Sequence, residues 1–191
     1  FVNKIQAGAE FLAKTLKEKG TIYGVTTGYG DSCTQAIPPE LVHDLPIHLT
    51  RFHGCGLGKF FNEETTMAIL VTRLNSLSQG YSGVSYGLLE KIEAFLKHGI
   101  LPLIPEEGSV GASGDLTPLS YVAAALIGER TVRYKGKVTP TKNVLKKLGI
   151  APLRLRPKEG LAIMNGTAAM TAVACLAYQR AQYLAKLCAR I

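Results

Sequence analysis

Apolar residues recur every three to four positions along most of the chain, a spacing that places them on one face of a helix. This periodicity predicts helices over residues 3–19, 39–52, 62–79, 84–97 and 141–148, followed by a long helical element from 158 to 191. Strand patterns are confined to a short stretch within 21–30 and to a hairpin at 130–139. We therefore expect a mainly α fold with a small β component.

The final helical element contains, near its start, a pair that disfavours helix, Asn165–Gly166. The pair indicates either a kink or break in the helix, or an Asn165 side chain that projects into a site. The Ala-rich apolar pattern that follows is typical of a long helix in a bundle. We expect residues 1–157 to form an N-terminal domain and residues 158–191 to begin a helical bundle.

The composition is that of a globular protein, since 47% of the residues are hydrophobic and 19% are charged. A net charge of +8 is compatible with nucleic-acid binding, but the Lys and Arg residues are scattered along the chain. The densest groups of Lys, within 14–19 and 142–147, lie at helical spacing, which is typical of solvated helix faces. We expect no nucleic-acid partner.

The cysteines carry no metal-binding signature. Cys33, Cys55, Cys175 and Cys188 form no CxxC pair and have no zinc spacing with histidine. Cys175 and Cys188 fall in an apolar helical pattern and are expected to be buried. This cysteine usage suits a reducing compartment, and we identify neither a secretory signal nor an apolar run of membrane length. We therefore expect a cytoplasmic protein with no metal and no membrane contact.

Both ends of the chain lie close to helical patterns. Phe1 precedes one by a few residues, and Ile191 falls inside another without a Gly or Pro stop signal. We expect from this that the chain is a fragment of a longer protein.

Residues 108–118 form a turn of small residues that leads into an apolar helix over 119–127. Thr117 is expected at the N-cap and Pro118 at the first helical position. Within the turn, Ala112–Ser113–Gly114 leaves room for the amide nitrogen of Gly114 to approach the carbonyl carbon of Ala112. Attack and loss of two waters, one of them from Ser113, would leave a five-membered ring with an exocyclic methylene. Such a ring is an electrophile that no ordinary side chain supplies.

Residues 108–123 are similar throughout to the signature of the histidine/phenylalanine/tyrosine ammonia-lyase family. The resemblance implies that Ala112, Ser113 and Gly114 cyclise autocatalytically into 4-methylidene-imidazol-5-one (MIO), with no metal. It implies the N-terminal portion of the ammonia-lyase fold, leading into a long-helix bundle. It also implies a homotetramer whose sites are shared between chains. Members of the family are more than twice as long as this chain.

Residues 23–30 resemble a second signature of the family, Tyr-Gly-x-x-Thr-Gly-aromatic-Gly. Thr26 and Tyr29 depart from its commonest version, where Asn and Phe are usual. The spacing fits neither a GxGxxG nor a P-loop phosphate site. By the resemblance, Tyr23 is the general base that removes a proton from the substrate β-carbon. Free tyrosine is a poor base at neutral pH because its pKa is about 10, so the site must favour the phenolate.

Phe52–His53 precedes a glycine-rich stretch that ends at Lys59, and His53 stands where a P-loop requires glycine. In the family this position holds the pair that selects the aromatic ring of the substrate. Histidine lyases typically have Ser-His there, tyrosine lyases His-Leu and phenylalanine lyases Phe-Leu. Phe52–His53 is a hybrid of these pairs, so the choice of substrate stays open.

Residues 161–167 match the family stretch Leu-x-x-x-Asn-Gly-Thr. By the resemblance, the Asn165 amide binds the substrate carboxylate region or the MIO ring. Arg73-Leu74-Asn75 is also similar to the family, and we expect structural roles for Arg73 and Asn75.

The resemblance implies non-oxidative deamination of an aromatic amino acid, first of all L-histidine to urocanate and ammonia. A tyrosine or phenylalanine ammonia-lyase and an aromatic aminomutase remain alternatives. A different class of function is also open, in which the chain is an inactive structural or partner-binding fragment. The reason is that later residues of the family contribute to the site, including the arginine that holds the substrate carboxylate.

Overall fold

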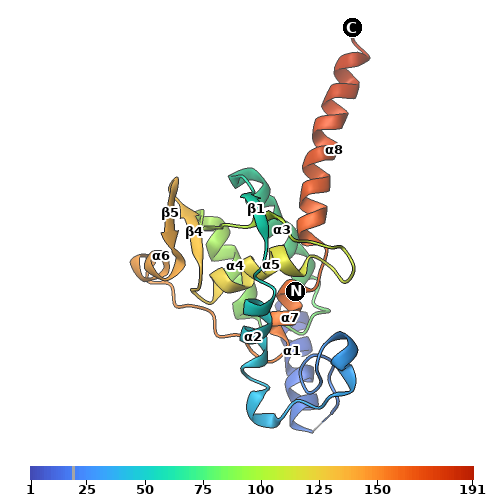
Figure 1. Cartoon of the computed structure of the whole chain (residues 1–191), viewed down its shortest axis with the longest axis vertical. Helices are drawn as coiled ribbons and strands as arrows, with labels where there is room; N and C mark the ends of the chain where they lie inside the picture. The colour runs from blue at the N-terminus through green and yellow to red at the C-terminus, as the bar shows by residue number, and fades with distance from the viewer. Residues whose placement is uncertain (19) are drawn as a thin grey trace.

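The computed structural model describes residues 1–18 and 20–191, whose helices and strands are arranged as in Figure 1. The α-helices are α1 (Val2–Lys17), α2 (Leu45–Phe52), α3 (Glu63–Ser78), α4 (Tyr86–His98), α5 (Leu116–Leu126), α6 (Thr141–Leu148), α7 (Glu159–Met164) and α8 (Ala168–Cys188). The 3-10 helices η1 (Gly30–Thr34) and η2 (Pro39–Leu41) lie between α1 and α2. The mainly α fold with a small β component is therefore confirmed.

The strands are short and form two antiparallel sheets. They are β1 (Leu57–Phe60), β2 (Leu101–Pro102), β3 (Pro105–Glu107), β4 (Thr131–Tyr134) and β5 (Lys137–Pro140). β1 pairs with β3, while the other sheet has the order β2-β4-β5. The hairpin expected at 130–139 is β4 and β5, joined by Lys135–Gly136.

α5 lies at the centre of the fold and is buried from Thr117 to Leu126. It contacts α2, α7, α8 and β2, and α3 packs against α4 and α8. A helix that is apolar on all sides is stable only when other elements surround it, which accounts for the central place of α5. The loop that carries residues 112–114 leads directly into α5, so the core fixes one end of that loop.

Four helices of the described residues end at a glycine in the left-handed conformation. These are Gly80 after α3 (φ 79°), Gly99 after α4 (φ 63°), Gly128 after α5 (φ 86°) and Gly149 after α6 (φ 67°). At the end of α5 the N–H groups of Gly128 and Glu129 bond back to the last turn at 2.9 Å each, which is a Schellman motif. The helices expected to end at 97 and 148 thus end next to Gly99 and Gly149. The motif after α5 reverses the chain and brings Glu129 towards α2.

Three predicted elements differ from the structure. The helix expected over 39–52 is two pieces, η2 and α2, because Pro46 has no N–H to donate and is tolerated only in the first turn of a helix. The strand expected within 21–30 is a turn in which Gly24 has a φ of 66°, and only Thr27 makes an isolated bridge, to Ala36. The first helix ends at Lys17, and residue 19 of the expected range lies outside the described residues.

The buried face of α3 is shifted from the predicted one. The apolar periodicity of residues 62–79 predicts a buried face of Met67, Leu70, Val71 and Leu74. Leu70 is fully buried, whereas Val71 is 50% exposed and the side chain of Arg73 is 4% exposed. Because α3 is covered by α4 and α8, the buried face includes a charged residue that an apolar pattern alone does not assign to a core.

The final element breaks where Asn165–Gly166 disfavours helix, giving a short buried α7 and a long α8. α8 extends away from the rest of the chain (Figure 1), and its buried residues are the three alanines of its first two turns. Cys175 and Cys188 are therefore exposed, and the expectation that they are buried is wrong for this chain.

The span Glu159–Cys188 is long and apolar enough to cross a membrane by length and composition alone, which corrects the expectation that no such run exists. All of α7 within this span is buried inside the protein fold.

Candidate active site

A cavity of about 630 Å³ brings together five of the residues predicted to form the site. Its lining includes Tyr23, Phe52, His53, Ser113 and Asn165. They come from the loop after α1, the end of α2, the loop before α5 and the end of α7. A larger hollow of about 910 Å³ between α1 and residues 20–43 contains none of these side chains. The fold therefore places these five predicted site residues around one cavity.

The loop of Ala112–Ser113–Gly114 is docked on the junction between α7 and α8. Gly114 has a φ of 101°, and a Cβ added there would lie 2.8 Å from the nitrogen of Gly166 and 3.1 Å from Oδ1 of Asn165. The next amide, that of Asp115, donates to the Gly166 carbonyl at 2.7 Å. Position 114 thus accepts only glycine, on grounds of both conformation and space.

Asp115 is the N-cap residue of α5, where Thr117 was expected, and α5 begins at Leu116. Its side chain, which is 1% exposed, does not cap its own helix. Oδ1 instead accepts from the Ser109 hydroxyl at 2.7 Å, and Oδ2 accepts from the Met170 N–H at 2.8 Å in the first turn of α8. The expectations of Thr117 at the N-cap and Pro118 at the first helical position are therefore wrong. The helix starts earlier because proline is tolerated throughout the first turn, where its missing N–H would have no partner within the helix.

Arg73 reaches the same junction from α3. Its guanidinium donates to the Ala162 carbonyl in α7, and a Cβ at Gly166 would overlap it. Burial lowers the pKa of Arg73 to about 10, and the negative charge of Asp115 opposes that shift. Arg73 therefore remains a cation at neutral pH. These contacts support the structural role expected for Arg73.

Tyr23 is half exposed and lies at the edge of the cavity. Its Oη accepts a hydrogen bond from the backbone N–H of Gly30 at 2.9 Å. An N–H that donates to a phenolic oxygen stabilises negative charge on that oxygen. Tyr29 packs edge-on against Tyr23 with ring centroids 6.3 Å apart, and burial raises the pKa of Tyr29 to about 12. Of these two tyrosines, Tyr23 has the surroundings that suit a base.

Phe52 and His53 end α2 and lie edge-on to each other, with ring centroids 5.1 Å apart. Nδ1 of His53 lies 3.1 Å from the Leu49 carbonyl. We assign the imidazole proton to Nδ1, because only a donor makes this contact favourable. Nε2 of the neutral ring is then an acceptor available to a ligand, while Phe52, which is 80% exposed, offers an aromatic face.

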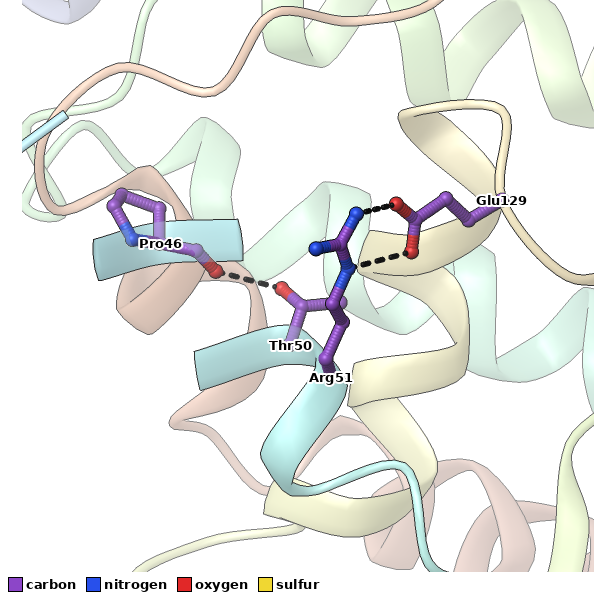
Figure 2. Close-up of polar contacts among 4 residues, drawn as sticks. All are labelled: Pro46, Thr50, Arg51 and Glu129. Atoms are coloured by element: carbon purple, nitrogen blue, oxygen red, sulfur yellow. Dashed lines mark hydrogen bonds and ion pairs between the residues drawn. The ribbon is translucent and has the colours of Figure 1, made fainter. Parts of the chain in front are cut away.

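Two neighbouring residues of α2 make polar contacts just before this pair, one within the helix and one to Glu129 (Figure 2). The Thr50 hydroxyl is fully buried against α7 and donates to the Pro46 carbonyl at 2.9 Å. Arg51 donates to both carboxylate oxygens of Glu129, at 2.6 and 3.4 Å. The end of α2 is thereby tied to the residues that follow α5.

The sequence reasoning missed one wall of the cavity. Leu45, His48 and Leu49 line it together with Phe52, and these positions share one face of α2. Their spacing of three, four and seven residues was a signal that could have identified them. The other lining residues come from different segments. Ser32 left no local signal, whereas the rest lie within the stretches that resemble the family: Gly28, Tyr29, Gly30, Leu116 and Leu161.

Comparison with known proteins places the fold. Tyrosine aminomutase from Streptomyces globisporus matches with a TM-score of 0.88 and 41% identity, over 95% of this chain and 34% of that protein. Histidine ammonia-lyase from Trypanosoma cruzi matches with a TM-score of 0.87 and 33% identity, over 97% and 35%. The fold is thus that of ammonia-lyases and aminomutases.

The sequence comparisons agree. Residues 1–191 match the family described as aromatic amino acid lyase. Histidine ammonia-lyase of Shouchella clausii (strain KSM-K16) is 43% identical over 184 residues, covering 96% of this chain and 37% of that protein. The chain belongs to the aromatic amino acid lyase family. It spans little more than a third of the length of its curated relatives.

Proposed function

We propose that the full-length protein containing this chain deaminates L-histidine to urocanate and ammonia without oxidation. The observation that carries the proposal is the single cavity lined by Tyr23, His53, Ser113 and Asn165. The 43% identity to a histidine ammonia-lyase supports the choice of reaction and of substrate.

We further propose that Ala112, Ser113 and Gly114 form MIO, on which the family in general depends. The surroundings of the tripeptide fit this group, because Gly114 is packed against Asn165 and Gly166 where a side chain has no room. The ring supplies an electrophilic alkene that a substrate with a barely acidic β-proton needs. Ser113, which contributes the methylene carbon, lines the cavity.

In this proposal Tyr23 Oη takes the proton from the substrate β-carbon, and the Gly30 N–H stabilises the phenolate form that does so. Nε2 of His53 accepts a hydrogen bond from an N–H of the substrate imidazole, and Phe52 packs against the ring. Asn165 lies next to Gly114 and directs its amide to the tripeptide or to the substrate carboxylate.

The second candidate is a tyrosine-specific enzyme, either a lyase or an aminomutase. It is favoured by the 41% identity to tyrosine aminomutase and by the fact that Nε2 of His53 can accept from a phenol as well. A phenylalanine lyase is third, because a benzene ring leaves the Nε2 acceptor without a donor.

The test is an assay of the full-length protein against histidine, tyrosine and phenylalanine. The proposal expects urocanate release from histidine with the highest kcat/KM of the three, and absence of urocanate overturns it. Intact-mass measurement tests MIO separately, since cyclisation removes two waters and the Ser113→Ala variant should keep the uncyclised mass. Full mass in an active unaltered protein would contradict the MIO assignment.

The proposal also covers the wider setting of the site. We propose a homotetramer with sites shared between chains, a cytoplasmic location, and a domain division at residues 157–158. The cavity here is built from one chain, which covers 37% of its curated relative. We therefore expect the 191-residue chain alone to be inactive or nearly so, and measurable turnover by the purified chain would refute this.

A further inference from the structure

α5 connects the candidate active site with the segment that carries Phe52–His53. Its N-terminal end follows Ala112–Ser113–Gly114, and its C-terminal end is followed by Glu129 and Arg130, which we call the α5 corner. The α5 corner contacts segment 51–56 on both sides of Phe52–His53, through the Arg51 side chain and through the Gly54 carbonyl. One helix therefore connects the reactive tripeptide with the pair that faces the substrate ring.

On the side before the pair, Glu129 receives two hydrogen bonds from Arg51, at 2.6 and 3.4 Å (Figure 2). The side chains of Arg51 and Glu129 are 58% and 34% exposed, so the ion pair contributes little to stability. However, because Arg51 binds both carboxylate oxygens, the pair fixes the orientation of the two side chains as well as the distance between them.

On the side after the pair, Arg130 donates to the Gly54 carbonyl at 2.9 Å. Its guanidinium lies 4.2 Å from the centre of the Tyr121 ring, and the Tyr121 hydroxyl accepts from the Gly56 N–H at 3.1 Å. A side chain at position 54 would overlap the guanidinium, so the close approach depends on Gly54. Segment 54–56 is thus held by side chains of α5 and of the corner that follows it.

Arg130 holds this place in a conformation that costs free energy. Its φ is 57°, which non-glycine residues rarely adopt. The carbonyl of Arg130 accepts from both the N–H and the hydroxyl of Thr141, at 3.0 Å each, and Thr141 is fully buried. A strained residue retained by two bonds from a buried partner is of the kind found at functional sites.

We propose that Glu129 and Arg130 are positioning residues that set where His53 lies relative to the tripeptide, and so determine which aromatic ring is accepted. This inference deepens the proposed function and rests on it. The only hydrogen bond of the His53 ring in the described structure goes to the Leu49 carbonyl of the same helix, so the ring is placed by the backbone that carries it. A shift of segment 51–56 therefore moves Nε2 directly, and misplacement by roughly 1 Å is costly to a positioned group.

The experiment compares Arg130→Met with Arg154→Met in the full-length protein. Arg154 is exposed and does not line the cavity. Its change to Met alters size and charge in the same way, so it is a matched control. Urocanate and cinnamate serve as probes, because they differ in the ring and not in the acrylate. Arg130→Met should weaken urocanate binding about 10-fold and cinnamate binding less than about 2-fold, since only urocanate uses Nε2. Arg154→Met should change neither.

Hydrogen exchange of the 53–58 peptide gives a readout that needs no ligand. Exchange should be faster in Arg130→Met than in Arg154→Met, because without the bond to the Gly54 carbonyl the segment opens more often and exposes its N–H groups. Tyr121→Phe is the second variant if Arg130→Met does not fold. It removes only the acceptor of the Gly56 N–H and should weaken urocanate binding about 3-fold, with the same selectivity.

Equal weakening of both acids, or no change in either, would overturn the positioning role. If the unaltered protein bound neither acid and deaminated none of the three amino acids, the proposed function would fail. Exchange of residues 53–58 would then decide alone, and equal exchange in the two arginine variants would refute the inference.

Discussion

The carboxylate of Asp115 accepts a hydrogen bond from the backbone N–H of Met170 at 2.8 Å, so a residue that begins α5 caps the first turn of α8. This bond joins the loop of residues 112–114 to the helix that leaves the fold. Anionic side chains are favourable at this position because the first N–H groups of a helix have no partner within it.

Asp115→Ala should therefore destabilise the protein by about 3 kcal/mol, since two hydrogen bonds to a buried charge are lost and the cationic Arg73 loses its countercharge. The full-length protein would show this as a lower midpoint of urea unfolding. Asp31→Ala is the control, because Asp31 is exposed and should change stability by less than about 0.5 kcal/mol. Equal midpoints for the two variants would disprove the capping role.

Gly114→Ala and Gly111→Ala form a second matched pair, because both glycines have positive φ but different surroundings. A Cβ at Gly114 meets the Gly166 backbone at 2.8 Å, whereas nothing lies within 4 Å of one at Gly111. We expect a loss of about 3 kcal/mol at Gly114 and about 1 kcal/mol at Gly111. Thermal unfolding of the full-length variants checks this, and a larger loss at Gly111 would contradict the docking of the tripeptide loop.

Tyr23→Phe should lower kcat at least about 100-fold with little change in KM, since in the proposed reaction Tyr23 Oη takes the β-proton and does not bind the substrate in its ground state. Tyr29→Phe should lower kcat less than about 3-fold, because its hydroxyl stays protonated and its ring still packs on Tyr23. Steady-state kinetics with histidine distinguishes the two. If Tyr29→Phe proved the more damaging change, Tyr29 would be the base.

Tyr29 also makes the free energy of unfolding depend on pH, and the raised pKa determines the direction of that dependence. Its pKa is raised to about 12 by burial first and by Tyr23 second, whereas the unfolded chain titrates near 10. Between these values the unfolded state releases a proton that the folded state keeps, so stability falls as pH rises from about 10 to 12. The half-exposed ring limits the effect to about 1 kcal/mol. Between these pH values the midpoint of urea unfolding should fall less steeply with pH for Tyr29→Phe than for the unaltered protein. Equal slopes for the two proteins would refute the linkage.

Local signals predicted the parts of the fold that local chemistry controls. Asn62 caps α3 by accepting from the Thr65 N–H at 2.8 Å, and Gly99 and Gly149 end their helices in the left-handed conformation, roles for which asparagine and glycine are the preferred residues. The sheet of β1 and β3 was missed because its residues are few and mostly exposed, so they carry no alternating pattern. Periodicity alone could not find it.

The candidate site was predicted mainly through its resemblance to a family, since Tyr23 and Asn165 are far apart in sequence and no spacing rule connects them. The contacts that hold it were not predictable. Asp115 with Met170 and Arg130 with Gly54 are pairs whose partners lie 55 and 76 positions away. Such pairs form only when packing brings the segments together, and the local sequence around each residue does not indicate its partner.

His53→Leu tests the chemistry of ring selection directly. The change converts the pair into Phe-Leu, which is typical of phenylalanine lyases, and removes the Nε2 acceptor. A buried imidazole N–H of the substrate would then lack a partner, so kcat/KM for histidine should fall about 100-fold. The value for phenylalanine should rise, because an apolar ring prefers an apolar wall.

His43→Leu is the control for this change, since His43 does not line the site cavity and should leave both substrates within about 2-fold. Equal losses of histidine and phenylalanine activity in His53→Leu would mean that His53 supports the fold of the pocket and does not read the ring. A selective loss of histidine activity would tie specificity to one nitrogen, placed by α2 and held by its contacts with α5.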